Sequence, residues 1–291
     1  MRKDAFPAVL SMLVNLTDIS VECEVAMDWN SFPALVKEAL HVTVALPSLV
    51  SVQLQHLSFD QSGDLTSFLQ SCKHVDSLVL SSIAVRDIGG NAGLDPRLGL
   101  CSLTLGPSHL PLIHSVMSVF DMQSLWYLHA TVPIPELEAE IQHLLDGTRN
   151  LEYFHVCLDH HHNTSNIDLQ NLTHLRTLEI TLLFDFSTAP DGFDPVGWTG
   201  NIIATSRNPS PIQHVILNVR VDERDLSYLS RLKELERFLV APEISSLRRL
   251  TVNLHSFDVD FNVHGCEPDV RDAFPILFAR GMLEMVFLGV P

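Results

Sequence analysis

A short apolar sequence motif, called the phrase below, recurs along the chain at a nearly constant spacing. This repeat limits the possible folds more than any other feature. Each copy carries apolar residues at its first, fourth and sixth positions. Within 46–183 the first positions are Leu49, Val75, Leu100, Leu125, Leu151 and Leu175. The steps between them are 26 (75−49), 25 (100−75), 25 (125−100), 26 (151−125) and 24 (175−151) residues. Such a period indicates a repeat architecture in which each unit supplies one strand and one return segment.

The spacing inside each phrase is that of a β-strand, because alternate side chains of a strand point to the same face. One unit cannot cover its own apolar row, so neighbouring units must stack on one another. We therefore predict an α/β fold, namely a leucine-rich-repeat-like right-handed solenoid with a curved parallel sheet and helices or loops on the convex side. The fourth positions are expected to stack in one column: Val52, Leu78, Leu103, Leu128, Phe154 and Leu178.

The pattern predicts a single solenoid domain over 1–291, with regular repeats at 46–183 and irregular longer repeats and a C-terminal cap at 184–291. The period breaks after Leu183 in a stretch rich in proline and glycine. The phrase resumes at Ile212 and Leu247, after steps of 37 (212−175) and 35 (247−212) residues. A terminal repeat must cover the open end of the core, so we expect a last strand at 281–287.

The segments between the phrases carry apolar residues at helical spacing. This spacing predicts helices within 32–40, 65–72, 113–120, 137–145, 198–203, 225–241 and 270–278. The glycine-rich segment 87–99 instead predicts an irregular turn. Three glutamates at the start of the helix at 137–145 (Glu136, Glu138 and Glu140) suit the positive end of the helix dipole and are otherwise expected on a solvated face.

Composition and charge exclude several classes of protein. Apolar residues make up 46% of the chain and charged residues 18%, which indicates a folded chain with a large core. The net charge of −17 argues against nucleic acid and anionic membrane as partners. No stretch approaches the roughly 20 consecutive apolar residues of a membrane span.

The cysteines and the N-terminus favour an intracellular protein, cytoplasmic or nuclear. The five cysteines are scattered and include no CxxC pair, which is typical of reduced thiols. The basic residues at 2–3 and the apolar run at 5–16 also fit a signal peptide. However, that run continues into a repeat-like phrase that begins at Leu16, which favours an intracellular protein over one with a signal peptide.

The third and fifth positions of each phrase should lie exposed on the sheet, stacked from strand to strand. In the central repeats these positions, apart from Thr177, and one neighbour are aromatic, imidazole or acidic. We predict one partner-binding patch for a protein target on the concave sheet face, formed by Trp126, Tyr127, His129, Tyr153, His155 and Glu179. The alternative is a half-buried sheet surface with ordinary aromatic neighbours.

The run Asp159-His160-His161-His162 is the most conspicuous polar feature of the chain. Zinc sites use histidine and carboxylate ligands, but adjacent histidines of one loop do not all converge on one ion. Whether His160–His162 bind a metal is left open against the alternative of a solvated loop. No cofactor is predicted, and the chain lacks a GxSxG elbow for a nucleophile, so we do not expect an enzyme.

Several phrases resemble the F-box/leucine-rich-repeat-like proteins that are abundant in mushroom-forming fungi. The resemblance covers nearly the whole chain. It is carried by Trp29-x-x-Phe32-Pro33, Ala39-Leu40, Leu46-Pro47-Ser48-Leu49-x-x-Val52-x-Leu54, Ser71-Cys72-Lys73-His74-Val75-x-x-Leu78-x-Leu80 and Phe274-Pro275-x-Leu277-x-x-Arg280-Gly281-x-Leu283.

This resemblance implies the substrate-recognition region of an F-box ubiquitin-ligase receptor. In such proteins the repeats hold a target while an N-terminal F-box binds a Skp-type adaptor. No separate helical F-box segment precedes Leu16 in this sequence, so an adaptor is expected as a partner only if the full-length product contains an F-box. The alternative is a freestanding scaffolding repeat protein with no ubiquitin-ligase role.

Overall fold

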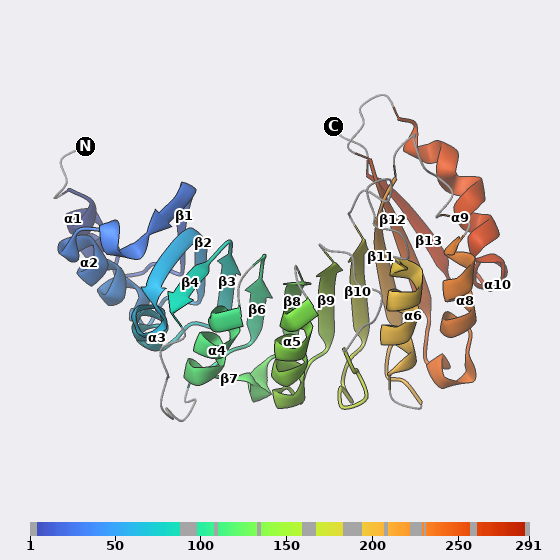
Figure 1. Ribbon diagram of the computed structural model, residues 1–291, viewed down its shortest axis with the longest axis horizontal. Coiled ribbons are helices and arrows are strands. Elements are labelled where there is room, and N and C mark those ends of the chain that lie inside the picture. Colours follow the sequence, from blue (N-terminus) through green and yellow to red (C-terminus); the bar gives the residue numbers. More distant parts are fainter. Residues whose placement is uncertain are drawn as a thin grey trace. The chain divides into compact units, whose positions relative to one another are not determined.

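The strands of the protein form a large open parallel sheet with helices between them, so the chain is a mixed α/β protein (Figure 1). The computed structural model describes residues 5–87, 98–107, 110–132, 135–158, 167–182, 194–206, 209–221, 229, 231–256 and 261–288. The chain divides into two compact units, 1–128 and 129–291, which are described separately below. The predicted α/β class with a parallel sheet is confirmed, whereas the single solenoid domain stays a prediction.

Unit 1 consists of parallel strands connected by helices. Its sheet has the order β1-β2-β3-β6, and β4 pairs with the far end of β2. The strands are β1 (Asp18–Asp28), β2 (Ser51–Gln61), β3 (Ser77–Ser81), β4 (Ala84–Asp87) and β6 (Ser102–Leu105), with a separate short pair β5 (Leu98–Gly99) and β7 (Phe120–Asp121). The helices are α1 (Ala5–Met12), α2 (Ala34–Val44), α3 (Ser62–Ser71) and α4 (Leu110–Val119), with 3-10 turns η1 (Trp29–Ser31) and η2 (Met122–Ser124).

Unit 2 has the same organisation, with the strand order β9-β10-β11-β12-β13. The strands are β9 (Tyr153–Leu158), β10 (Thr177–Leu182), β11 (His214–Arg220), β12 (Arg249–His255) and β13 (Leu283–Leu288), and β8 (Tyr127–Val132) contains the boundary between the units. The helices are α5 (Pro135–Gly147), α6 (Pro195–Ala204), α8 (Lys233–Leu239), α9 (Glu267–Ala273) and α10 (Pro275–Ala279), with 3-10 turns η4 (Pro242–Ile244) and η5 (Val263–Cys266).

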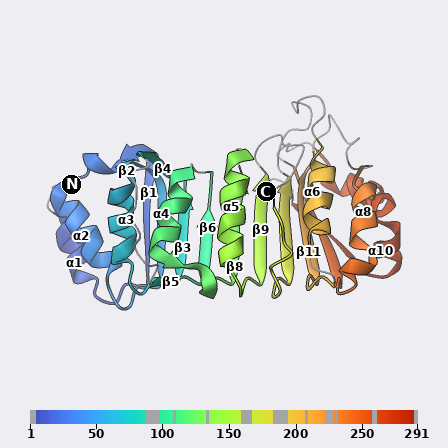
Figure 2. The same cartoon turned by 60° about the horizontal axis from the view of Figure 1, so that its bottom comes forward.

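Helices lie over one face of the sheet in each unit. In unit 1 these are α3 and α4, and in unit 2 they are α5, α6 and α8 (Figure 2). The opposite face of each unit is called the helix-free face. Side chains of a strand alternate between the two faces, so every second residue of the repeated phrase is directed to the helix-free face.

The repeated phrases stack in the predicted register within each unit. In unit 1 Val52 pairs with Leu78. In unit 2 Phe154 pairs with Leu178, which pairs with Val215 on its other side. All five side chains are fully buried. Burying a side chain of this size stabilises the fold by about 1.5–3 kcal/mol, so these columns form the core.

Most of the predicted helices are present, and the C-terminal one differs from the prediction. The expected single helix at 270–278 is two helices, α9 and α10, which are separated at Phe274. Pro275 explains the break, because proline has no amide hydrogen and disfavours helical geometry in the residue before it. Of the long helix expected at 225–241, the structure describes α8 together with flanking residues, and 222–228 and 230 lie outside the described residues.

Glu138 corrects the expectation of a solvated acidic face on α5. Its side chain is 1% exposed, and a carboxylate oxygen accepts a hydrogen bond from Nε1 of Trp198 at 2.9 Å. This bond ties α5 to α6. Within the part of the chain that the structure describes, none of the helices has both the length and the apolar character needed to span a membrane.

Candidate functional site

Four of the six predicted binding residues lie together on the helix-free face of unit 2. His129 is on β8, Tyr153 and His155 are on β9, and Glu179 is on β10. The imidazole rings of His129 and His155 stack, with centroids 4.0 Å apart and an angle of 16° between the planes. The Tyr153 hydroxyl donates a hydrogen bond to Glu179, and Nε2 of His155 lies 3.6 Å from Oε1 of Glu179. These four side chains form one continuous cluster.

The other two predicted residues, Trp126 and Tyr127, belong to unit 1. Their rings meet edge to face, with centroids 5.9 Å apart and an interplanar angle of 62°. Trp126 is 50% exposed, which makes it one of the large apolar side chains that unit 1 presents to solvent. Their membership of the same patch as the four residues of unit 2 stays a prediction.

The strand register explains why the cluster assembles. In the parallel β9–β10 pair, Tyr153 is opposite Thr177 and His155 is opposite Glu179. The intervening residues Phe154 and Val156 are directed into the core and are fully buried. Because successive side chains point to opposite faces, the polar residues between these core positions are brought to the helix-free face.

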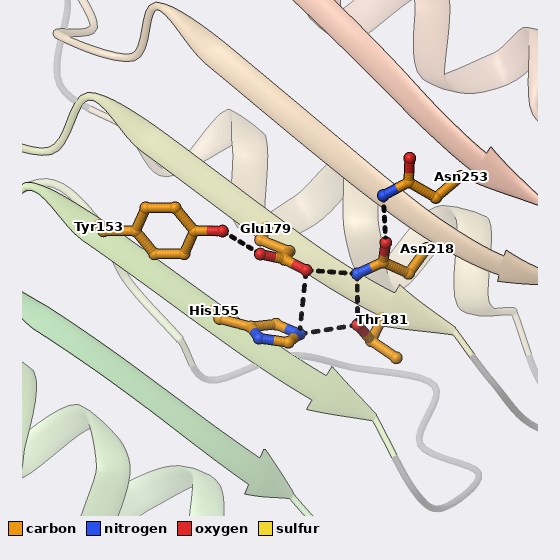
Figure 3. A network of polar contacts seen from close by, with 6 residues as sticks. All are labelled: Tyr153, His155, Glu179, Thr181, Asn218 and Asn253. Carbon is orange, nitrogen blue, oxygen red and sulfur yellow. Dashed lines mark hydrogen bonds and ion pairs between the residues drawn. The ribbon is translucent and has the colours of Figure 1, made fainter. Parts of the chain in front are cut away.

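Glu179 is the centre of a hydrogen-bonded network that crosses four strands (Figure 3). One carboxylate oxygen, Oε2, accepts the Tyr153 hydroxyl, and the other, Oε1, accepts from Nδ2 of Asn218 at 2.5 Å. The Glu179 side chain is 16% exposed and that of His155 is 15% exposed, so both are mostly shielded from water. Hydrogen bonds to an ionised acceptor are stronger than neutral ones, which favours a single fixed arrangement of these groups.

Thr181 connects the histidine to the asparagine. Its Oγ1 accepts a hydrogen bond from Nδ2 of Asn218 at 2.8 Å and lies 2.7 Å from Nε2 of His155. The direction of the bond between Thr181 and His155 is set by which ring nitrogen of His155 carries the proton. We use the name Glu179 network for Tyr153, His155, Glu179, Thr181, Asn218 and Asn253.

Thr181, Asn218 and Asn253 are members of the network that the sequence analysis did not identify. The amide of Asn253 on β12 donates from Nδ2 to Oδ1 of Asn218 on β11 at 2.6 Å. All three occupy the seventh position of their phrases, counted from Leu175, Ile212 and Leu247. The predicted patch takes in the third and fifth positions only, and the same alternation extended by one step reaches these three residues.

Burial keeps the histidines of this face neutral at pH 7. The pKa of His129 is lowered to about 4, first by burial and then by the neighbouring His155, against an opposing effect of Glu179. The pKa of His155 is lowered by burial, again against Glu179. The contact between His155 and Glu179 is therefore a polar contact rather than an ion pair at this pH.

A second polar group lies on β11, β12 and β13 of the same face. Nε2 of His214 is 2.8 Å from Oγ1 of Thr251, which donates to Oε2 of Glu284 at 3.1 Å. Arg249 reaches the same carboxylate oxygen at 3.5 Å. Burial and the charge of Arg249 lower the pKa of His214, against the opposing effects of Glu284 and Glu179. The helix-free face of unit 2 thus carries hydrogen-bonded side chains from β9 to β13.

The site offers a fixed set of aromatic, imidazole, amide and carboxylate groups at the surface of a rigid sheet. No group of three or more histidine, cysteine, aspartate or glutamate residues with the arrangement of a metal site occurs among the described residues. The Asp159–His162 run, and with it the metal binding considered for His160–His162, lies outside the described residues. A surface of ordered side chains of this kind is suited to binding a partner molecule.

Comparison with known proteins adds no relative. No protein-family model matches the chain, and a search of the curated proteins finds no match.

Proposed function

We propose that the chain is a protein–protein interaction module and that the helix-free face of unit 2 holds its protein target. The Glu179 network supports this proposal, because its interlocked side chains present a surface that is already ordered before a partner arrives. Pre-ordered side chains lower the entropic cost of association. Tyrosine on such a surface is a residue type that often contributes strongly to binding.

We also propose a more specific fold, namely a leucine-rich-repeat-like right-handed solenoid over 1–291 with the helix-free face on its concave side. The recurring phrase and the parallel register of each unit support it. Binding is proposed rather than catalysis, because the carboxylate and imidazole groups of the network are occupied with one another. The five free cysteines are compatible with the proposed intracellular location.

The resemblance to F-box/leucine-rich-repeat-like proteins supports a more specific role as the substrate-recognition region of a ubiquitin-ligase receptor. The alternative is a freestanding scaffolding repeat protein. Mixing the full-length gene product with a purified Skp-type adaptor separates the two. Co-elution of the two proteins on gel filtration supports the receptor role, and separate elution supports the scaffold.

A pair of matched variants tests the binding face. Thr177 on β10 and Ser77 on β3 occupy the same third position of the phrase, on unit 2 and unit 1 respectively, and both are half-buried. We expect Thr177→Arg to obstruct the face beside Tyr153, and Ser77→Arg to leave it intact. Both variants should fold, because each added side chain extends into solvent from a position outside the core.

The readout is quantitative affinity purification from the source cells with the wild-type chain and both variants as bait. The expected result is at least one protein that wild type and Ser77→Arg retain equally and that Thr177→Arg loses by about tenfold or more, the factor that corresponds to about 1.4 kcal/mol of binding energy. Direct titration with that protein then confirms the loss. If every captured protein is retained equally by Thr177→Arg, the proposed face is wrong.

A further inference from the structure

The outer edge of unit 1 presents an unpaired strand. β1 is the last strand in the order β1-β2-β3-β6 and pairs, within the described residues, with β2 alone. The carbonyl oxygen of Thr17 accepts a hydrogen bond from the amide of Ser51 in β2 at 3.1 Å. Alternate residues of a parallel strand bond to opposite neighbours. The amides and carbonyls of Asp18, Ser20 and Glu22 are therefore directed away from β2.

The free part of this edge is short. The β1–β2 register is regular from Asp18 to Glu22 and then shifts, so that Met27 is opposite Leu57. The residues between Glu22 and Met27 form a bulge. Bulges re-aim a strand and end its pairing, and on edge strands they limit association with other chains. The part of β1 that is available to pair with a further strand is thus the five-residue segment Asp18–Glu22.

The side chains around this segment are acidic and apolar. Asp18, Glu22, Glu24 and Asp28 all lie on β1, and residues 5–36 contain neither lysine nor arginine. The bulge and its end add exposed apolar surface, with Val25 71% exposed and Met27 39% exposed. A second copy of the same edge would place carboxylates next to carboxylates, which is unfavourable. The electrostatic complement of this edge is an extended segment that carries lysine or arginine.

We propose that the Asp18–Glu22 edge of unit 1 binds a basic, extended segment of a partner protein, which adds one strand to the sheet beside β1. Main-chain hydrogen bonds to Asp18, Ser20 and Glu22 supply the affinity, and the carboxylates and the exposed Val25 select alternating basic and apolar side chains. This surface lies in the other unit from the proposed binding face of unit 2, so the two proposals stand or fall separately.

The probe is a fluorescein-labelled seven-residue peptide of alternating lysine and valine, and fluorescence anisotropy with the full chain measures its binding. The first variant is Ser20→Pro. Proline at an outward-facing position removes the donor that the peptide needs and leaves the β1–β2 ladder intact. We expect the dissociation constant to rise by about tenfold or more, with an unchanged thermal unfolding midpoint.

Charge variants separate strand addition from general attraction of a basic peptide to an acidic protein. Glu22→Lys on the edge should raise the dissociation constant by about tenfold, and it remains informative if Ser20→Pro fails to fold. The matched control Glu243→Lys, at an exposed acid of unit 2, should change it by less than about twofold. Amide hydrogen exchange gives the direct readout, because the peptide should slow exchange at Ser20 and Glu22.

Two results overturn the proposal. In the first, the peptide binds Ser20→Pro as tightly as wild type and leaves the β1 amides unprotected. In the second, Glu243→Lys weakens binding as much as Glu22→Lys does, which means that the peptide responds to net charge alone. The acidic side chains of β1 then serve only to keep an open edge from pairing with other chains, as charged residues on edge strands often do.

Discussion

The helix-free faces of the two units have the same backbone arrangement and different side chains. On β2, β3 and β6 of unit 1 the third and fifth positions of the phrase are Ser51, Gln53, Ser77, Val79, Ser102 and Thr104, and Tyr127 on β8 is the one aromatic residue among the third positions of that unit. In unit 2 the corresponding strands carry Tyr153, His155, Glu179 and His214, joined by the asparagines of the seventh position. The repeat therefore determines the backbone arrangement of both units. It does not determine which side chains occupy the helix-free face, and these differ between the units.

The physical reason lies in side-chain length and in the residue on the neighbouring strand. Neighbouring strands are about 4.8 Å apart, so a serine on one strand is too short to bridge to the next strand without a longer partner. Gln53 is long enough, but the residue opposite it on β3 is Val79, which has no polar group. Glutamate, histidine and asparagine do reach across, as the 2.5 Å bond from Asn218 to Glu179 illustrates. Among the described residues of unit 1, the six face positions form no hydrogen bonds to one another. In the proposed function, the hydrogen-bonded face of unit 2 is the part that recognises the partner.

The largest expected effect tests whether the two cores are equivalent. Leu78 in unit 1 and Leu178 in unit 2 hold the same fourth position and are both fully buried. We expect Leu78→Ala and Leu178→Ala each to lower the free energy of unfolding by about 3 kcal/mol, because each leaves a cavity in a packed column. Urea unfolding followed by circular dichroism measures both. A difference of more than about 2 kcal/mol between them contradicts the equivalence of the cores.

The core was predictable from the sequence because every repeat needs apolar residues at the same positions, as Leu78 and Leu178 illustrate. Stacking requires an apolar residue at each inward position, so the phrase had to recur and its register could be read directly. Val52 opposite Leu78 and Phe154 opposite Leu178 follow from that requirement. The break between α9 and α10 was missed because the apolar spacing continues through Phe274, although Pro275 marks the interruption.

A smaller effect is expected from Glu179→Ala, which sharpens the contrast between the two faces. The change removes the carboxylate that accepts hydrogen bonds from Tyr153 and Asn218 in a mostly shielded site. We expect the free energy of unfolding to fall by about 2 kcal/mol, because an unsatisfied buried donor costs about 1–3 kcal/mol. Chemical denaturation measures this loss.

The matched control is Thr104→Ala, at the same fifth position in unit 1. Its side chain is half-buried and does not belong to a network among the described face positions, so the expected change is within about 0.5 kcal/mol. If Glu179→Ala and Thr104→Ala lower the free energy of unfolding equally, the hydrogen bonds of the Glu179 network contribute little to stability. The two faces then carry different side chains without a difference in rigidity.

The site was only partly predictable, because its polar residues follow no required pattern. Tyr153, His155 and Glu179 stood out because they are aromatic, imidazole or charged groups at exposed positions. Thr181 and Asn218 did not, because they lie one step beyond the fifth position and because small polar residues on a sheet face are common. The structure shows that Asn218 bonds to both Glu179 and Thr181. Glu138 was misassigned for a related reason, since its partner Trp198 is 60 residues away in the sequence.

The smallest expected effect is a pH dependence that arises from the stacked histidines of unit 2. The pKa of His129 is lowered from 6.5 to about 4, and burial is the main cause. Between these two values the unfolded chain binds a proton that the folded chain does not, so the stability from this group is complete above pH 6.5 and declines as the pH falls towards 4. We expect a loss on the order of 1 kcal/mol at pH 5, after allowance for partial solvent screening.

The carboxylates of the chain also titrate in this range, so the effect is measured as a difference between variants. His129→Gln removes the titrating group and should flatten the decline in unfolding free energy between pH 7 and pH 5 relative to wild type. The control His74→Gln, at an exposed histidine of unit 1, should leave the wild-type slope unchanged. The pKa of His155, which stacks on His129, is also lowered by burial, so an unchanged slope in His129→Gln shows that His129 itself does not cause the decline.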